Sequence, residues 1–122
     1  MANLSIAFEV PTNETCNRMS TERPIDFTHL ATQTMGDKEL ETEILQLYMR
    51  QARCALQELA GAEGAGLGAI AHRLKSAASA VGAFRVAAQA EALEAHPEDA
   101  AILAGLGAAV IEAENFILKL MR

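Results

Sequence analysis

Hydrophobic and polar positions alternate with a helical period through most of the chain. In residues 24–36, Asp26 stands at an N-cap position, Phe27 and Leu30 share one face, and Gly36 ends the pattern. An aspartate side chain accepts hydrogen bonds from the free amides of a first helical turn, and glycine tolerates the left-handed conformation that ends many helices. This segment therefore predicts a short leading helix.

Four longer helices are predicted after this segment. Asp37 is expected to cap the first, and the glycine-rich stretch 61–68 to end it. The second is expected over about 67–81 and the third over about 84–95, while Pro97 suits the first turn of the fourth. Positions at helical spacing define the expected faces of the first and last of these helices, namely Leu40, Ile44, Leu47, Tyr48, Gln51 and Ala55, and Ile102, Leu106, Val110, Ala113, Ile117 and Leu120.

The connections between these helices are short, and helices joined by few residues pack as antiparallel neighbours. Only 4% of the residues are aromatic, and the apolar content is mostly Ala, Leu and Ile, which favours helix-on-helix packing. We therefore expect an all-α fold, an antiparallel up-down-up-down four-helix bundle with a short leading N-terminal helix, over residues 24–122. Residues 1–23 show no clear period and are expected to form a flexible or loosely packed N-terminal arm.

The formal net charge is −6, and no run of Lys or Arg interrupts it. An acidic domain has no general attraction for nucleic acid or for an anionic membrane, so neither is expected as a partner. The N-terminus lacks the regions of a signal peptide, and no apolar run is expected to reach the length of a transmembrane helix. We expect a soluble, cytoplasmic monomer.

Several other chemistries lack the residue spacing that they require. Cys16 and Cys54 form no CxxC pair and are expected to be reduced bystanders. The stretch 61–68 lacks the signature of a phosphate-binding loop. No Glu-x-x-His or His-x-x-x-His occurs, so a metal- or haem-binding bundle is not expected, and His29 and His96 are interpreted as surface or cap residues.

His72 differs from the other histidines in its helical position. The expected core stripe of its helix comprises Leu67, Ile70, Leu74, Ala77, Ala78 and Val81. His72 points almost opposite, and the predicted face around it consists of Gly68, Lys75, Ser76 and Ser79, with Ala83 one turn further and Arg73 at the rim. These mostly small side chains would let another protein approach the imidazole closely.

A neutral imidazole is a competent nucleophile near neutral pH, and one with a lysine nearby and no metal cluster suits transient attachment of a phosphoryl group. Ser76 and Ser79 offer hydroxyl donors to phosphoryl oxygens. Glu94 lies as far after Phe84 as His72 lies before Gly82, so a helical hairpin would bring the two to similar heights. Either this carboxylate accepts a hydrogen bond from Nδ1 of His72, or it is a plain surface residue.

The segment HRLKSAASAVGA, residues 72–83, resembles the signature of histidine phosphotransfer (HPt) domains of multistep phosphorelays, approximately H-x-L-K-G-x-S/A-x-x-x-G. His72, Leu74, Lys75, Ala78 and Gly82 match this signature in order. Residues 25–48 also look like the usual approach to such a domain, and the resemblance covers about residues 24–121. Ser76 departs from the pattern, because glycine is usual there.

The resemblance implies that His72 takes a phosphoryl group from a receiver-domain aspartate and passes it to another receiver, usually through Nε2. Lys75 would help to neutralise the phosphoryl group, and Glu94 resembles the carboxylate that supports the ring in chemotaxis-kinase phosphotransfer domains. The implied partners are response-regulator receiver domains or a hybrid histidine kinase. The chain itself would be a phosphoryl carrier rather than an enzyme, with no cofactor and no ATP site, and Mg²⁺ would be held by the receiver.

One alternative stays open. A non-catalytic adaptor that binds a receiver or kinase without turning over phosphate would share the exposed face of small residues. The joint presence of His72 and Lys75 favours the carrier, because an adaptor has no need of a nucleophile.

Overall fold

The computed structural model describes residues 23–121, and every regular element in this range is a helix. The helices are α3 (Phe27–Thr34), α4 (Lys38–Gly61), α5 (Ala65–Val81), α6 (Phe84–Ala95) and α7 (Ala100–Leu120). The predicted all-helical class with a short leading helix is therefore confirmed for this range. The predicted N-terminal arm lies outside the described residues, apart from its last residue.

Three of the helices begin at an aspartate whose carboxylate accepts hydrogen bonds from amides of the first turn. Asp26 and Asp37 cap α3 and α4 as predicted, and Asp99 caps α7. The expectation that Pro97 lies in the first turn of the last helix is wrong. Pro97 lies in the preceding turn, and α7 begins only at Ala100, where Asp99 can satisfy the free amides.

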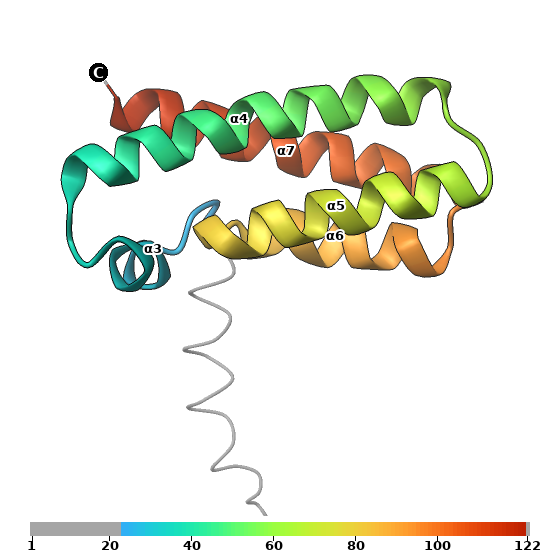
Figure 1. The fold of residues 1–122 in the computed structure, drawn as a ribbon. Coiled ribbons are helices and arrows are strands. Elements are labelled where there is room, and N and C mark those ends of the chain that lie inside the picture. The colour runs from blue at the N-terminus through green and yellow to red at the C-terminus, as the bar shows by residue number, and fades with distance from the viewer. Residues whose placement is uncertain (1–22, 122) are drawn as a thin grey trace, which may run out of the picture.

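In the view of Figure 1, α4 and α7 lie above, and α5 and α6 lie below. α5 and α6 lie side by side and pack most extensively, α4 packs on α5, and α7 packs on α6. α3 crosses the end of the bundle at which α5 turns into α6 (Figure 1). The largest fully buried side chains come from the segment before α3 and from all five helices, and they include Ile25, Leu30, Tyr48, Leu74, Leu93, Leu106 and Ile117.

The buried face of α4 is rotated from the predicted one. Tyr48 and Ala55 are buried as expected, but Leu40 and Leu47 are 38% and 47% exposed, and Gln51 is also exposed. The face that packs on the core consists of Glu41, Leu45, Tyr48, Ala52, Ala55 and Leu59. The predicted stripe therefore included one flank of α4 that no neighbouring helix covers. Leu120, at the end of α7, is likewise exposed instead of packed in the core.

The turn between α5 and α6 is anchored to the segment that leads into α3. Gly82 has a φ of 83°, and its carbonyl oxygen accepts a hydrogen bond of 2.9 Å from the Asp26 amide. A Cβ placed on Gly82 would lie 2.8 Å from the Asp26 carbonyl oxygen, closer than such atoms approach. Glycine is therefore required here by both its backbone conformation and its surroundings.

Helix α7 is long and apolar enough, by length and composition alone, to cross a membrane, with a mean hydropathy of 1.6. The expectation that no apolar run reaches this length is therefore wrong. One face of α7 packs in the core through Leu106, Val110, Ala113 and Ile117. This packing accounts for part of its apolar content.

Candidate functional site

His72 lies in the middle of α5, an alanine-rich helix that ends at Gly82. Its side chain is 60% exposed, while Ala71 before it and Leu74 after it are buried in the core. The helical period therefore places the imidazole on the outer surface of the bundle while its neighbours fix the helix beneath it.

The imidazole of His72 is held from the neighbouring helix. Its Nδ1 lies 3.0 Å from Oε2 of Glu94 on α6, a hydrogen bond between residues 22 positions apart in the chain. A carboxylate accepts only, so the proton of a neutral ring is placed on Nδ1. The Nε2 atom then keeps its lone pair, and it has no hydrogen-bond partner within residues 23–121.

The same carboxylate also contacts Lys75. The Nζ atom of Lys75 lies 3.7 Å from Oε1 of Glu94, and both side chains are about one-third exposed. Each oxygen of Glu94 thus has its own partner, the ring on one side and the ammonium on the other. The sequence predicted the approach of His72 and Glu94 as one of two readings, but it gave no signal that Lys75 shares the carboxylate.

Most, but not all, of the residues predicted to form a docking face are at least partly exposed. Ser76 is exposed, Gly68 and Ser79 are partly exposed, and Arg73 is exposed and forms an ion pair with Glu58 of α4. The assignment of Ala83 to this face is wrong, because Ala83 is completely buried. The chain leaves the helical path at Gly82, so the period that would have brought Ala83 to the surface no longer applies.

A groove between α4 and α5 adjoins this face, and it was not predicted from the sequence. It has a volume of about 570 Å³ and is lined on the α4 side by Arg50, Gln51 and Cys54. Ser76 and Ala77 line it on the α5 side. Their small size is the only signal in the sequence that could have suggested a hollow, because the distance between two helices cannot be deduced from either one.

Among the described residues, His29, His96 and Cys54 form no hydrogen bond or ion pair with the imidazole of His72. His96 is exposed, as interpreted from the sequence, but His29 is not a plain surface residue. Its ring packs edge-on against Phe84, and its Nε2 is buried without a hydrogen-bond partner among the described residues. Cys54 is a free, exposed thiol, and Cys16 lies outside the described range. Residues 23–121 hold no group of three or more potential metal ligands.

Comparison with protein families gives a match over most of the helical region. A family model described as the Hpt domain matches residues 43–116, more than half of the chain. The chain belongs to the Hpt domain family. Hpt domains act in histidine phosphotransfer within phosphorelays, together with receiver domains and histidine kinases. The match includes His72, Lys75 and Glu94. Comparisons with curated proteins and with solved structures found no match.

Proposed function

We propose that this Hpt domain is a phosphoryl carrier that accepts a phosphoryl group on His72 from a receiver-domain aspartate and passes it to a second receiver. The observation that carries the proposal is the outward-facing imidazole of His72, whose Nδ1 is engaged by Glu94 at 3.0 Å while Nε2 points to no partner among the described residues. The four long helices, joined by turns of a few residues, are proposed to form the antiparallel up-down-up-down bundle expected from the sequence.

The proposed transfer step makes use of this geometry. The lone pair of Nε2 attacks the phosphorus of the aspartyl phosphate, the N–P bond forms, and the P–O bond of the mixed anhydride breaks. The leaving group is the aspartate carboxylate, which keeps the electron pair. The imidazole ring becomes positively charged because it retains the proton on Nδ1, and the carboxylate of Glu94 stabilises this charge. The reverse sequence returns the phosphoryl group to a receiver.

Lys75 is proposed to neutralise the phosphoryl oxygens. It lies one helical turn after His72, and its ammonium group is already on this side of the bundle through its contact with Glu94. The hydroxyl groups of Ser76 and Ser79 are further potential donors to the phosphoryl oxygens. Gly68, Arg73, Ser76 and Ser79 are proposed to lie under the docked receiver, but Ala83 is not.

The proposed partners are response-regulator receiver domains, a hybrid histidine kinase, or both. The chain would act as a cytoplasmic monomer with no cofactor and no ATP site of its own, and the receiver would supply the Mg²⁺ ion. The proposal as a carrier is supported by the neighbourhood of His72, where a nucleophile and the ammonium group of Lys75 share the carboxylate of Glu94.

Phosphotransfer from a panel of phosphorylated receiver domains tests the proposal. At least one receiver should label the wild-type chain, and His72→Gln should abolish the label while leaving the helical circular dichroism unchanged. Glutamine keeps a polar side chain of similar length but has no nucleophilic nitrogen. Label that persists in His72→Gln would refute the proposal. A receiver that binds the chain without ever labelling it would instead indicate the adaptor.

A further inference from the structure

The outer side of α7 is rich in apolar side chains, and no other helix of residues 23–121 covers it. Helix α7 packs on α4 and α6 through its opposite side, whereas Ile111 and Leu118 are 55% and 44% exposed. Six exposed positions, none of them charged, follow one another along this side at alternating steps of three and four residues. We call them the outer strip, and they are Ala101, Ala104, Ala108, Ile111, Asn115 and Leu118.

The spacing of the outer strip is typical of a helix that packs lengthwise against another helix. Alternating steps of three and four residues keep a narrow stripe on one side of a helix, as at the contact positions of coiled coils. At 1.5 Å per residue, the strip is about 26 Å long and covers most of α7. Its large apolar side chains, Ile111 and Leu118, gain stability when a partner removes them from water. The strip therefore favours a helical partner.

The sizes of the side chains in the outer strip fit a second copy of α7 in antiparallel orientation. A two-fold axis midway between Ala108 and Ile111 would bring Ile111 opposite Ala108 of the other copy, and Leu118 opposite Ala101 of the other copy. Each large side chain would thus meet an alanine, which lets two helices approach closely. In a parallel pair each residue would meet its own counterpart, and the alanine end of the strip would be left poorly packed.

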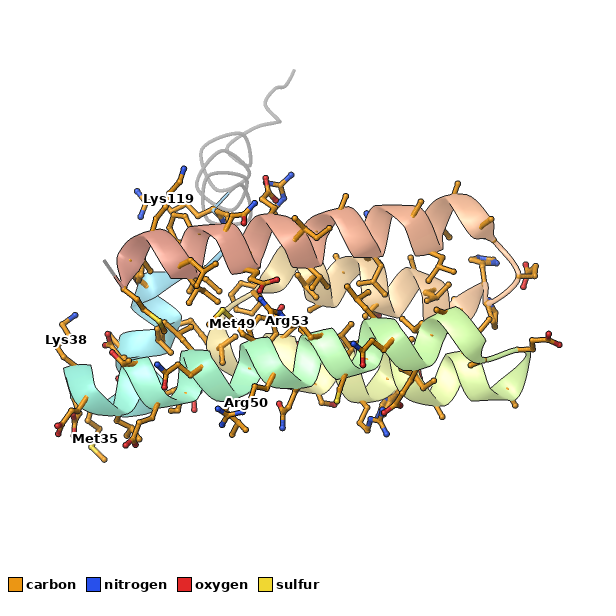
Figure 2. The ribbon with its side chains drawn as sticks, turned by 90° about the horizontal axis from the view of Figure 1, so that it is seen from above. Met35, Lys38, Met49, Arg50, Arg53 and Lys119 are labelled. Carbon is orange, nitrogen blue, oxygen red and sulfur yellow. The ribbon has the colours of Figure 1, made fainter. Side chains whose placement is uncertain are left out.

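The charges beside the outer strip fit the same orientation. Lys119 is the only basic residue of α7, and it projects from the edge of α7 that faces away from α4 (Figure 2). The two-fold axis would bring Lys119 close to the height of Glu98 of the other copy, and Glu98 is exposed in the turn before α7. The symmetry would form this attraction twice. It would also place the negative C-terminal end of each helix dipole beside the positive N-terminal end of the other.

We infer that the outer strip of α7 binds a second copy of this chain in antiparallel orientation and forms a two-fold symmetric dimer. The inference goes beyond the proposed function, for which one copy is enough. His72 lies on α5, across the bundle from α7, so both copies keep an accessible imidazole (Figure 1). One helix provides less than the about 800 Å² per partner of a standard interface, so we expect a dissociation constant on the order of 100 µM. The proposed monomer is the form that prevails below this concentration.

Sedimentation equilibrium of the full chain, at concentrations from about 10 µM to about 1 mM, measures the association. The mean mass should rise from that of one copy toward that of two. Ile111→Glu should raise the dissociation constant more than about tenfold, because two carboxylates would replace two apolar side chains near the two-fold axis. Leu47→Glu is the matched control, because it places the same charge on a leucine of α4 that is 47% exposed and lies outside the strip. It should change the dissociation constant less than about twofold.

Crosslinking tests the antiparallel orientation. In a background with Cys16→Ser and Cys54→Ser, a thiol is introduced by Ala108→Cys or by Leu118→Cys. Along the helix axis, position 108 would lie about 4.5 Å from its counterpart, and position 118 about 25 Å from its own. A short bismaleimide should therefore join two copies of Ala108→Cys but not two copies of Leu118→Cys.

Charge exchange tests the pairing of Lys119 with Glu98 of the other copy. Lys119→Glu and Glu98→Lys should each raise the dissociation constant about fivefold, because each creates a repulsion that the symmetry forms twice. The two substitutions together should restore the wild-type value to within about twofold. The single variants change the net charge in opposite directions, so general repulsion between acidic chains cannot explain a weakening by both.

Several results would overturn the inference. A chain that stays monomeric at the highest concentration leaves the strip without a second copy, and binding of that monomer to phosphatidylcholine vesicles through Ile111 would assign the strip to a membrane. A dimer that Ile111→Glu does not weaken uses another surface. Equal crosslinking of Ala108→Cys and Leu118→Cys would indicate a parallel pair. The proposed carrier function stands in each case, because labelling of His72 is measured separately.

Discussion

Replacing Gly82 with alanine should lower the free energy of unfolding by about 1–3 kcal/mol. A left-handed backbone conformation, here with a φ of 83°, costs a residue with a Cβ about 1–2 kcal/mol. The new Cβ would also lie 2.8 Å from the Asp26 carbonyl oxygen, so the segment leading into α3 must shift. That shift endangers the hydrogen bond from the Asp26 amide to Gly82, worth about 0.5–1.5 kcal/mol. The lower backbone entropy of unfolded alanine offsets about 0.4–1 kcal/mol of the sum.

Urea and thermal unfolding, followed by circular dichroism, measure this loss, and the melting temperature should fall by roughly 5–15 °C. Gly107→Ala is the matched control. Gly107 lies inside α7 with nothing within 4 Å of the position of a Cβ, so alanine should stabilise the helix by about 0.5–1 kcal/mol. A loss below about 0.5 kcal/mol for Gly82→Ala, or an equal loss for Gly107→Ala, would refute the reasoning.

Three further predictions concern the site and the core. Glu94→Gln should slow phosphotransfer about five- to tenfold, because the amide oxygen still accepts from Nδ1 of His72 but carries no charge; an unchanged rate would show that the charge has no role. Lys75→Ala should slow transfer or shorten the lifetime of phosphohistidine while leaving the unfolding free energy within about 0.5 kcal/mol, and wild-type kinetics would mean that Lys75 serves only solubility. Burial, and secondarily the nearby Glu114 carboxylate, raises the pKa of the Tyr48 hydroxyl above its usual range. The unfolded chain therefore loses this proton first, and stability should fall as the pH rises above about 10, less steeply in Tyr48→Phe; equal slopes in alkaline unfolding curves would contradict this.

Local interactions were predicted well from the sequence, because the residues that make them are close in the chain. Asp26 and Asp37 cap their helices through amides two or three residues away, so residue type and position suffice. The position of Pro97 was predicted wrongly because Pro97 and Asp99 are both typical of a helix start and lie two residues apart. The side chain of Asp99 accepts hydrogen bonds from the first free amides of α7, which a proline side chain cannot do.

Features that depend on the distance between helices were predicted less well. The exposed flank of α4, with Leu47 and Gln51, was assigned to the core because a helical period does not show which flank a neighbour covers. Ala83 was assigned to the surface because the period was continued past Gly82, where the backbone changes direction. The approach of Glu94 to His72 could be anticipated, because residues equally far before and after a tight turn lie opposite each other in a helical hairpin. The contact of Lys75 with the same carboxylate depends on side-chain reach and could not.

The two contacts of Glu94 have a consequence for the direction of signalling. Its oxygens lie 3.0 Å from Nδ1 of His72 and 3.7 Å from Nζ of Lys75, and the three side chains come from α5 and α6. In the proposed transfer, Lys75 would exchange the carboxylate of Glu94 for the phosphoryl group, and Glu94 would stay beside a ring that has become cationic. Under this proposal, loading and unloading would require only the rotation of a few side-chain bonds. A carrier built in this way would favour neither direction by itself, and the relative phosphorylation of its proposed partners would set which way the phosphoryl group travels.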